Sequence, residues 1–152
     1  MPNFLGTDLQ VFFLFERGQE WPPVPSEGLR VEPSPGGYRV LEAPFFVRNI
    51  AVGDVVAAEA DPSDVLWAGE RVAWGGHQVL RVNPRDGLTC AQVIAEFSPL
   101  GVVGEELDEY QIVAVDVPPD VPLQPLKDLL VAGLVAERWW YEEACISHAW
   151  PA

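Results

Sequence analysis

The fold is decided by residues 77–146, which read HQVLRVNPRDGLTCAQVIAEFSPLGVVGEELDEYQIVAVDVPPDVPLQPLKDLLVAGLVAERWWYEEACI. Runs rich in β-branched residues alternate here with stretches of helical periodicity, and proline, glycine and polar turn residues separate them. The resulting order is strand, helix, strand, strand, helix, strand. It predicts a ferredoxin-like βαββαβ half, in which an antiparallel sheet carries both helices on one face.

The first helix of this half is expected to begin just after Thr89. Gln92 follows three positions later, which is the capping-box pattern: the Thr89 hydroxyl accepts a hydrogen bond from the N–H of Gln92, and the Gln92 side chain accepts one from the N–H of Thr89. Helical spacing then groups the residues expected to be buried. These are Cys90, Val93, Ile94 and Phe97.

The second helix is expected to begin near Pro125 and to end near Gly133. Proline suits the first turn of a helix, where its missing N–H is no loss, and glycine is common just after a helix ends. Between the two helices, residues 102–107 and 110–117 predict a hairpin, and residues 139–146 predict the last strand.

The strand over residues 78–82 is expected to be central in this sheet. In the ferredoxin-like order the first strand pairs with neighbours on both sides, so at least one of its apolar side chains is expected to be fully buried. The candidates are Leu80 and Val82.

The first half, residues 1–76, predicts a small, bent antiparallel β-sheet or partial barrel. Its strands are separated by turn residues such as Gly36-Gly37, and residues 21–25 are too rich in proline for a sheet interior. The predicted strands are 10–15, 29–32, 38–42, 55–59 and 65–74. We therefore expect an α+β protein with a β-rich lobe (1–76) and a ferredoxin-like lobe (77–152), packed as one compact unit.

The charge of the chain is strongly negative. Among 152 residues, 23 are acidic and 9 are basic, and the formal net charge is −14. A nucleic-acid partner is not expected, because phosphates are bound by clustered basic residues and this chain has a single lysine, Lys127, and no basic stretch. The acidity serves solubility, or it attracts a basic protein partner. The oligomeric state is left open.

A cytoplasmic location is expected. Residues 1–8 lack the basic start of a secretion signal, and the apolar run that follows is too short to span a bilayer, so no membrane partner is expected. Cys90 and Cys145 fit a reducing compartment as small core residues.

Catalytic and metal motifs are not found at the required spacing, and no cofactor or metal is expected. His77 and Arg81 lie four apart on one strand face, about 13 Å apart along the backbone, and their long side chains could converge on one anion. Asp54 or Glu143 could complete such a site in a cleft between the two halves.

Four carboxylates crowd the predicted hairpin turn, where a solvated turn is favoured over a cation site. They are Glu105, Glu106, Asp108 and Glu109.

Six tryptophans are many for this length. Trp139 and Trp140 are adjacent in a predicted strand, so their side chains point to opposite sides of the sheet. An aromatic row on the open face of the sheet could include Trp67 and Trp74. The candidates for partner contact are therefore Trp67, Trp74 and Trp139, according to which are accessible to solvent.

Four segments together resemble a family of small bacterial proteins known only as a domain of unknown function. They are Pro44-Phe45-Phe46, Gly53-Asp54-Val55-Val56-Ala57-Ala58-Glu59, Gly76-His77-Gln78-Val79-Leu80-Arg81-Val82 and Tyr141-Glu142-Glu143-Ala144-Cys145. The resemblance covers about residues 28–148. It implies a bacterial cytosolic protein, and it implies no activity, cofactor or catalytic residue.

Two hypotheses follow. The first is a non-catalytic binding or accessory protein, for example of the immunity type, that captures a partner through an acidic, aromatic surface. The second is a small enzyme or ligand-binding module with a site around His77 and Arg81 between the lobes. The small size, the charge and the missing catalytic motifs favour the first.

Overall fold

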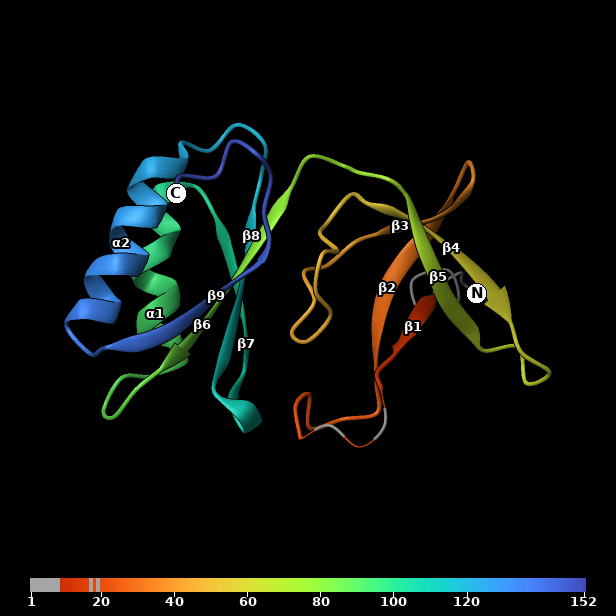
Figure 1. Ribbon diagram of the computed structural model, residues 1–152, viewed down its shortest axis with the longest axis horizontal. Coiled ribbons are helices and arrows are strands. Elements are labelled where there is room, and N and C mark those ends of the chain that lie inside the picture. Colours follow the sequence, from red (N-terminus) through yellow and green to blue (C-terminus); the bar gives the residue numbers. More distant parts are fainter. Residues whose placement is uncertain (1–8, 17, 19) are drawn as a thin grey trace, which may run out of the picture. The chain divides into compact units, whose positions relative to one another are not determined.

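In the computed structural model the chain forms two compact units, which divide between Gly76 and His77. The structure describes residues 9–16, 18 and 20–152, so the expectation about the first eight residues lies outside the described part. The fold is α+β, with β-strands in both units and α-helices in the second (Figure 1). Among the described residues, no helix is long and apolar enough to cross a membrane.

The first unit is a five-stranded β-barrel. Each strand pairs antiparallel with the next along the chain, and a parallel contact between Phe12 and Trp67 closes the barrel. The sequence predicted a bent sheet or partial barrel and missed this closure, because it depends on one pairing between strands that are distant in sequence. The strands are β1 (Gln10–Leu14), β2 (Ser26–Ser34), β3 (Gly37–Val40), β4 (Val55–Ala60) and β5 (Leu66–Ala73).

The second unit is a four-stranded antiparallel sheet with both helices on the same face (Figure 1). The strand order is β7-β8-β6-β9, so β6 is central, as predicted. Leu80 and Val82 on β6 have no exposed surface, which confirms the expected burial. In chain order the elements are β6 (Gln78–Pro84), α1 (Cys90–Phe97), β7 (Val103–Leu107), β8 (Ile112–Val117), α2 (Leu123–Val135) and β9 (Trp139–Cys145).

Helix α1 begins as the sequence predicts. The Thr89 hydroxyl accepts a hydrogen bond from the N–H of Gln92 at 3.1 Å, and the Gln92 side chain accepts one from the N–H of Thr89 at 2.8 Å. Three of the four residues expected on the inner face are buried, and Ile94 is partly buried and packs against the core. The capping box therefore sets both the start and the orientation of α1.

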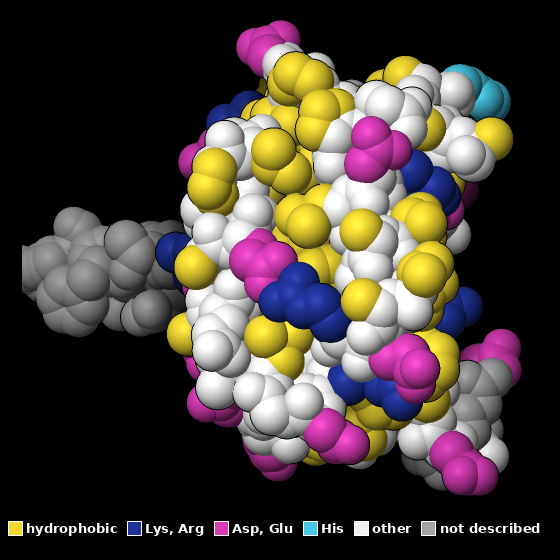
Figure 2. All heavy atoms as spheres, turned by 90° about the vertical axis from the view of Figure 1, so that its left-hand side faces the viewer, with side chains coloured by type: hydrophobic (Ala, Val, Ile, Leu, Met, Phe, Trp, Pro, Cys, Tyr) yellow, Lys and Arg dark blue, Asp and Glu magenta, His cyan; other side chains and the backbone are white. Residues whose placement is uncertain are grey.

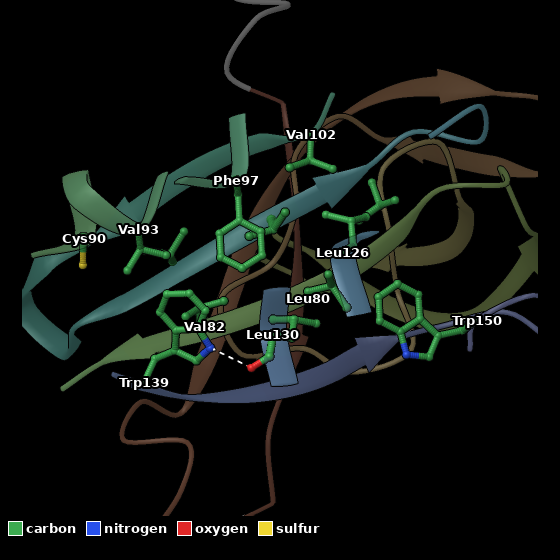
Figure 3. Close-up of a cluster of buried hydrophobic side chains, with 13 residues drawn as sticks. Leu80, Val82, Cys90, Val93, Phe97, Val102, Leu126, Leu130, Trp139 and Trp150 are labelled. Carbon is green, nitrogen blue, oxygen red and sulfur yellow. Dashed lines mark hydrogen bonds between the residues drawn. The ribbon is translucent and has the colours of Figure 1, made fainter. Parts of the chain in front are cut away.

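The Trp139 side chain belongs to the core of this unit, together with Phe97 and Leu130 (Figure 3). Its ring has no exposed surface, packs against Phe97 with ring centroids 5.5 Å apart, and donates a hydrogen bond from Nε1 to the Leu130 carbonyl at 3.1 Å. Leu130 belongs to α2 and Phe97 to α1. The ring therefore holds both helices on one strand of the sheet.

Gly133 was predicted to end the second helix, and this prediction is wrong. Helix α2 continues to Val135, and Gly133 is a buried position inside it. A Cβ atom at Gly133 would overlap the Trp139 indole ring. The glycine is therefore explained by the close approach of a large ring, which periodicity along one segment does not reveal.

We predict that Gly133→Ala destabilises the second unit. Alanine has the higher helix propensity by about 1 kcal/mol, but its methyl group meets a ring that is held in place, and overpacking of this kind costs about 1–3 kcal/mol. Urea unfolding followed by tryptophan fluorescence measures the change. The exposed neighbour Val131 offers a control, since Val131→Ala is expected to change stability by less than about 0.5 kcal/mol. Equal or higher stability of Gly133→Ala would contradict this account of the core.

Candidate functional site

Asp54 is a fully buried carboxylate in the first unit. Its side chain accepts hydrogen bonds from the N–H of Ala51 at 2.9 Å and of Gly75 at 2.8 Å, and Arg71 Nη1 lies 3.2 Å away. These contacts tie the loop before β4 to the end of β5. A buried carboxylate that accepts from two backbone N–H groups and lies beside an arginine has a structural role, so Asp54 stabilises the barrel.

The two tryptophans of the first unit that the sequence singled out differ in their surroundings. Trp67 is partly buried, lies 6.0 Å from the Phe12 ring, and donates from Nε1 to Asp61 at 2.9 Å. This hydrogen bond and those from the backbone of residues 63 and 65 hold the pKa of Asp61 below its usual range. Trp74 is 50% exposed. Trp67 therefore helps to close the barrel, whereas the Trp74 side chain is accessible to solvent.

His77 and Arg81 do not converge on one group. His77 Nδ1 lies 2.8 Å from a carboxylate oxygen of Asp116 on β8, and Arg81 Nε donates to Glu142 on β9 at 2.9 Å. Each side chain is thus engaged by a different carboxylate of a different neighbouring strand. The sequence missed Asp116, because only the register between β6 and β8 places it near His77.

Glu143 belongs to a cluster with Lys127 and Trp150. Its carboxylate accepts hydrogen bonds from Lys127 Nζ at 2.5 Å and from Trp150 Nε1 at 2.7 Å. The bond to Glu143 raises the pKa of Lys127 above its usual range. Trp150 is buried and joins the core of the unit (Figure 3). Glu143 therefore fastens the C-terminal segment onto α2 and β9.

Trp139 was a candidate for partner contact, and the structure corrects this. Its ring is fully buried under the helices, whereas the next side chain, Trp140, is 56% exposed on the other side of β9. The Arg85 guanidinium lies 4.6 Å from the centre of the Trp140 ring. The sequence established that one of the pair must face outward, but only the helix contacts decide which.

Most of the positive charge in the described part of the chain is paired with carboxylates. Figure 2 shows the helix-covered face, where Lys and Arg side chains lie beside Asp and Glu side chains. Pairing the few cations in this way leaves the excess of carboxylates to determine the field around the protein. The pairs are Arg30–Glu42, Arg39–Glu32, Arg71–Asp54, Arg81–Glu142, Arg85–Glu137, Lys127–Glu143 and Arg138–Glu96.

One group of uncompensated acids lies where β7 ends. Glu106 and Asp108 approach the buried thiol of Cys90, and the potential ligand atoms of the three residues lie within 4.8 Å of one another. A hydrogen bond with the Asp108 side chain raises the pKa of Glu106, and the charge of Asp108 adds to this effect. Burial, followed by the charges of Asp108 and Glu106, raises the pKa of Cys90 to about 11. The thiol is therefore neutral at physiological pH and is a poor nucleophile.

These three residues are also the ones that could hold a metal ion. A hollow of about 390 Å³ opens beside them, lined further by Leu88, Ala91 and other neighbouring residues. Two carboxylates and a protonated thiol make an incomplete ligand set, since metals bind the thiolate. The sequence pointed to the acidic turn but could not bring Cys90, sixteen or more residues earlier, to the same place.

The family assignment comes from residues 27–141, which match the family described as a domain of unknown function (DUF4265). The chain belongs to this family. The resemblance seen in the sequence is thereby confirmed. The family has no described activity, so membership itself assigns no role to Glu106, Asp108 or any other residue.

No curated protein matches the chain. A solved structure does, described as a novel crystal structure of a hypothetical protein from Neisseria gonorrhoeae. The TM-score is 0.76 at 20% sequence identity, and the alignment covers 92% of this chain and 96% of that one. At this identity the likeness establishes a shared fold. It extends over both units of this DUF4265 member.

We predict that Glu106→Gln stabilises this DUF4265 protein at pH 7 and has no effect at pH 3. The pKa of Glu106 in the folded chain lies above its unfolded value, so the stability that Glu106 contributes falls as pH rises through these two values. Glutamine removes the repulsion with Asp108 that causes this loss. Thermal unfolding followed by circular dichroism at both pH values measures the effect.

Glu105→Gln serves as the control, because it removes the same charge from the adjacent position of β7 and Glu105 is not the residue hydrogen-bonded to Asp108. A larger rise in Tm for Glu106→Gln than for Glu105→Gln at pH 7 is expected. Equal rises, or a rise that persists at pH 3, would show that the local repulsion between Glu106 and Asp108 is not the cause.

Proposed function

We propose that this protein is a non-catalytic binding or accessory protein that captures a basic partner through an acidic surface with exposed aromatic side chains. The observation that carries this proposal is the pairing of the cations. Because the described arginines and the lysine are largely matched by carboxylates, the net charge of −14 is carried by acids at the surface. Such a field speeds the approach of a basic protein and repels an acidic one.

The exposed aromatic anchor of this proposal is Trp140. Half-exposed tryptophans on a rigid strand are suited to contribute much of the energy of an interface, because they bury a large area at a small cost in conformational entropy. Trp140 lies on β9, at one edge of the sheet, and is 56% exposed although Arg85 stacks on it. The buried ring of Trp139 behind it fixes the strand that presents Trp140.

The alternative is a small enzyme or ligand-binding module around His77 and Arg81. The contact between His77 and Asp116 is the arrangement that would orient an imidazole for proton transfer. Against it, Arg81 is almost fully buried and engaged by Glu142, so it is poorly placed to receive a substrate.

We also infer a ferredoxin-like class for the second unit and a bacterial cytosolic origin for the protein. The ferredoxin-like class is supported by the element order β6-α1-β7-β8-α2-β9 and by the strand order β7-β8-β6-β9. The bacterial origin is supported by the neisserial source of the similar structure, and the cytosolic location by the two free, buried cysteines, Cys90 and Cys145.

We predict that the immobilised protein captures basic proteins from a lysate of its source organism at low salt and releases them at high salt. The Debye length falls from about 30 Å at 0.01 M to about 3 Å at 1 M ionic strength, so long-range attraction is lost. With the purified partner, Trp140→Ala is expected to weaken binding by about 2 kcal/mol, measured by calorimetry. Trp74→Ala is the control, since Trp74 is 50% exposed, close to the 56% of Trp140, but lies in the first unit.

As a control, the lysate is first passed over a second immobilised acidic protein of similar charge. This step removes proteins that bind any acidic surface. Salt-independent capture, or equal losses for Trp140→Ala and Trp74→Ala, would contradict the proposal. Recovery of a small metabolite that is converted by the wild-type protein and not by His77→Ala would replace it with the enzyme alternative.

A further inference from the structure

Strand β7 forms an exposed edge of the second sheet. It pairs with β8 on one side, and within the described part of the chain no strand pairs with its other side. In an edge strand the N–H and C=O groups of alternate residues point away from the sheet and can pair with a further strand. Val103 is 54% exposed, and Glu105 and Glu106 are exposed as well. The edge is therefore accessible at these positions.

The side chains of this edge place carboxylates on both sides of the sheet. Gly104 faces the helix layer, since a Cβ atom there would meet the Ile94 side chain of α1 at 2.9 Å. Side chains alternate along a strand, so Glu106 also points to the helix side and Glu105 to the opposite side. Each side of the edge thus presents negative charge to a strand that pairs with it.

This charge selects among the strands that could pair with β7. A second copy of the chain would bring Glu105 and Glu106 opposite or near the same residues, and like charges on paired strands are destabilising. A strand with lysine or arginine at the facing positions would instead form cross-strand ion pairs. The charge of this edge therefore disfavours pairing with a second copy of the chain and favours pairing with a basic segment of another protein.

The hollow beside Glu106 fits the side chain of such a segment. Apolar groups of Leu88 and Ala91 line it, and the carboxylates of Glu106 and Asp108 lie at the same place. A lysine or arginine side chain has a matching structure, with an aliphatic stem and a cationic head. A cationic head needs acceptors only, whereas a metal ion would have to displace the proton of Cys90.

We propose that the β7 edge binds an extended segment of the basic partner by strand addition, with two consecutive basic residues that reach Glu105 on one side of the sheet and Glu106 and Asp108 on the other. Strand addition supplies affinity through main-chain hydrogen bonds, and the facing side chains supply specificity. This inference rests on the proposed function in taking the partner to be basic. It adds the binding element and the pattern that the element recognises.

The test uses the full chain and a fluorescein-labelled hexapeptide, Thr-Val-Lys-Arg-Val-Thr, capped at both ends, with binding followed by fluorescence anisotropy at low salt. The double variant Glu105→Gln/Glu106→Gln is expected to raise the Kd about 10-fold. The control is Glu59→Gln/Glu70→Gln, which removes the same two charges from exposed positions on β4 and β5. Circular dichroism establishes that both variants are folded.

A second arm tests the backbone. Two versions of the peptide carry N-methyl groups at alternate positions, and one of them is expected to lose binding, because it lacks the N–H groups that pair with β7. Equal weakening in both charge variants, or full binding of both methylated peptides, would overturn the proposal and leave only non-specific attraction. Binding of Zn²⁺ at micromolar concentration, together with no binding of the peptide, would overturn it in favour of a metal site at Cys90.

The outcomes separate this inference from the proposed function. Trp140→Ala is expected to leave the affinity for the hexapeptide unchanged, because Trp140 lies on the opposite edge of the sheet. If the whole protein captures a basic partner in a salt-sensitive way while the hexapeptide does not bind, the edge assignment is wrong and the proposed function stands. If the hexapeptide binds at β7 while no basic protein is captured, the proposed function is wrong and the edge is a site for basic peptides.

Discussion

The buried ring of Trp139 is the contact on which the second unit depends. It fills the space between β9 and the two helices, and Gly133 is required for α2 to come close enough. Because side chains alternate along a strand, this single placement sends Trp140 to the open side and Glu143 to the helix side, where it meets Lys127. One apolar contact thereby fixes which aromatic group is accessible.

Charge is used in two different ways in this chain. In the ion pairs Arg81–Glu142 and Arg138–Glu96, carboxylates fasten elements to one another, and Arg138 holds the pKa of Glu96 below its usual range. At the end of β7 the opposite holds, since Glu106 and Asp108 repel each other. This repulsion lowers stability at neutral pH, and a cation bound between the two carboxylates would relieve it.

The sequence predicted the elements of the second unit well, because each depends on local chemistry. The capping box at Thr89, the β-branched and apolar run of β6 and the turn residues act within a few positions of one another. Contacts between distant segments were not predictable: the closure of the barrel through Phe12 and Trp67, the position of Gly133 under a ring, and the burial of Trp139 rather than Trp140. The same limit applies to the candidate site. The acidic turn was visible as a charge cluster, but the exposed edge of β7 and the nearby Cys90 required the strand order and the packing of α1.

The proposed binding of a basic strand by the acidic edge of β7 is directly testable. Amide hydrogen exchange measured by NMR, with and without a saturating basic hexapeptide, tests it residue by residue. Alternate amides of Val103–Leu107 are expected to exchange more slowly in the complex, while those of Trp139–Cys145 at the opposite edge are expected to be unchanged. Slowed exchange confined to β9, or no change in either strand, would contradict it.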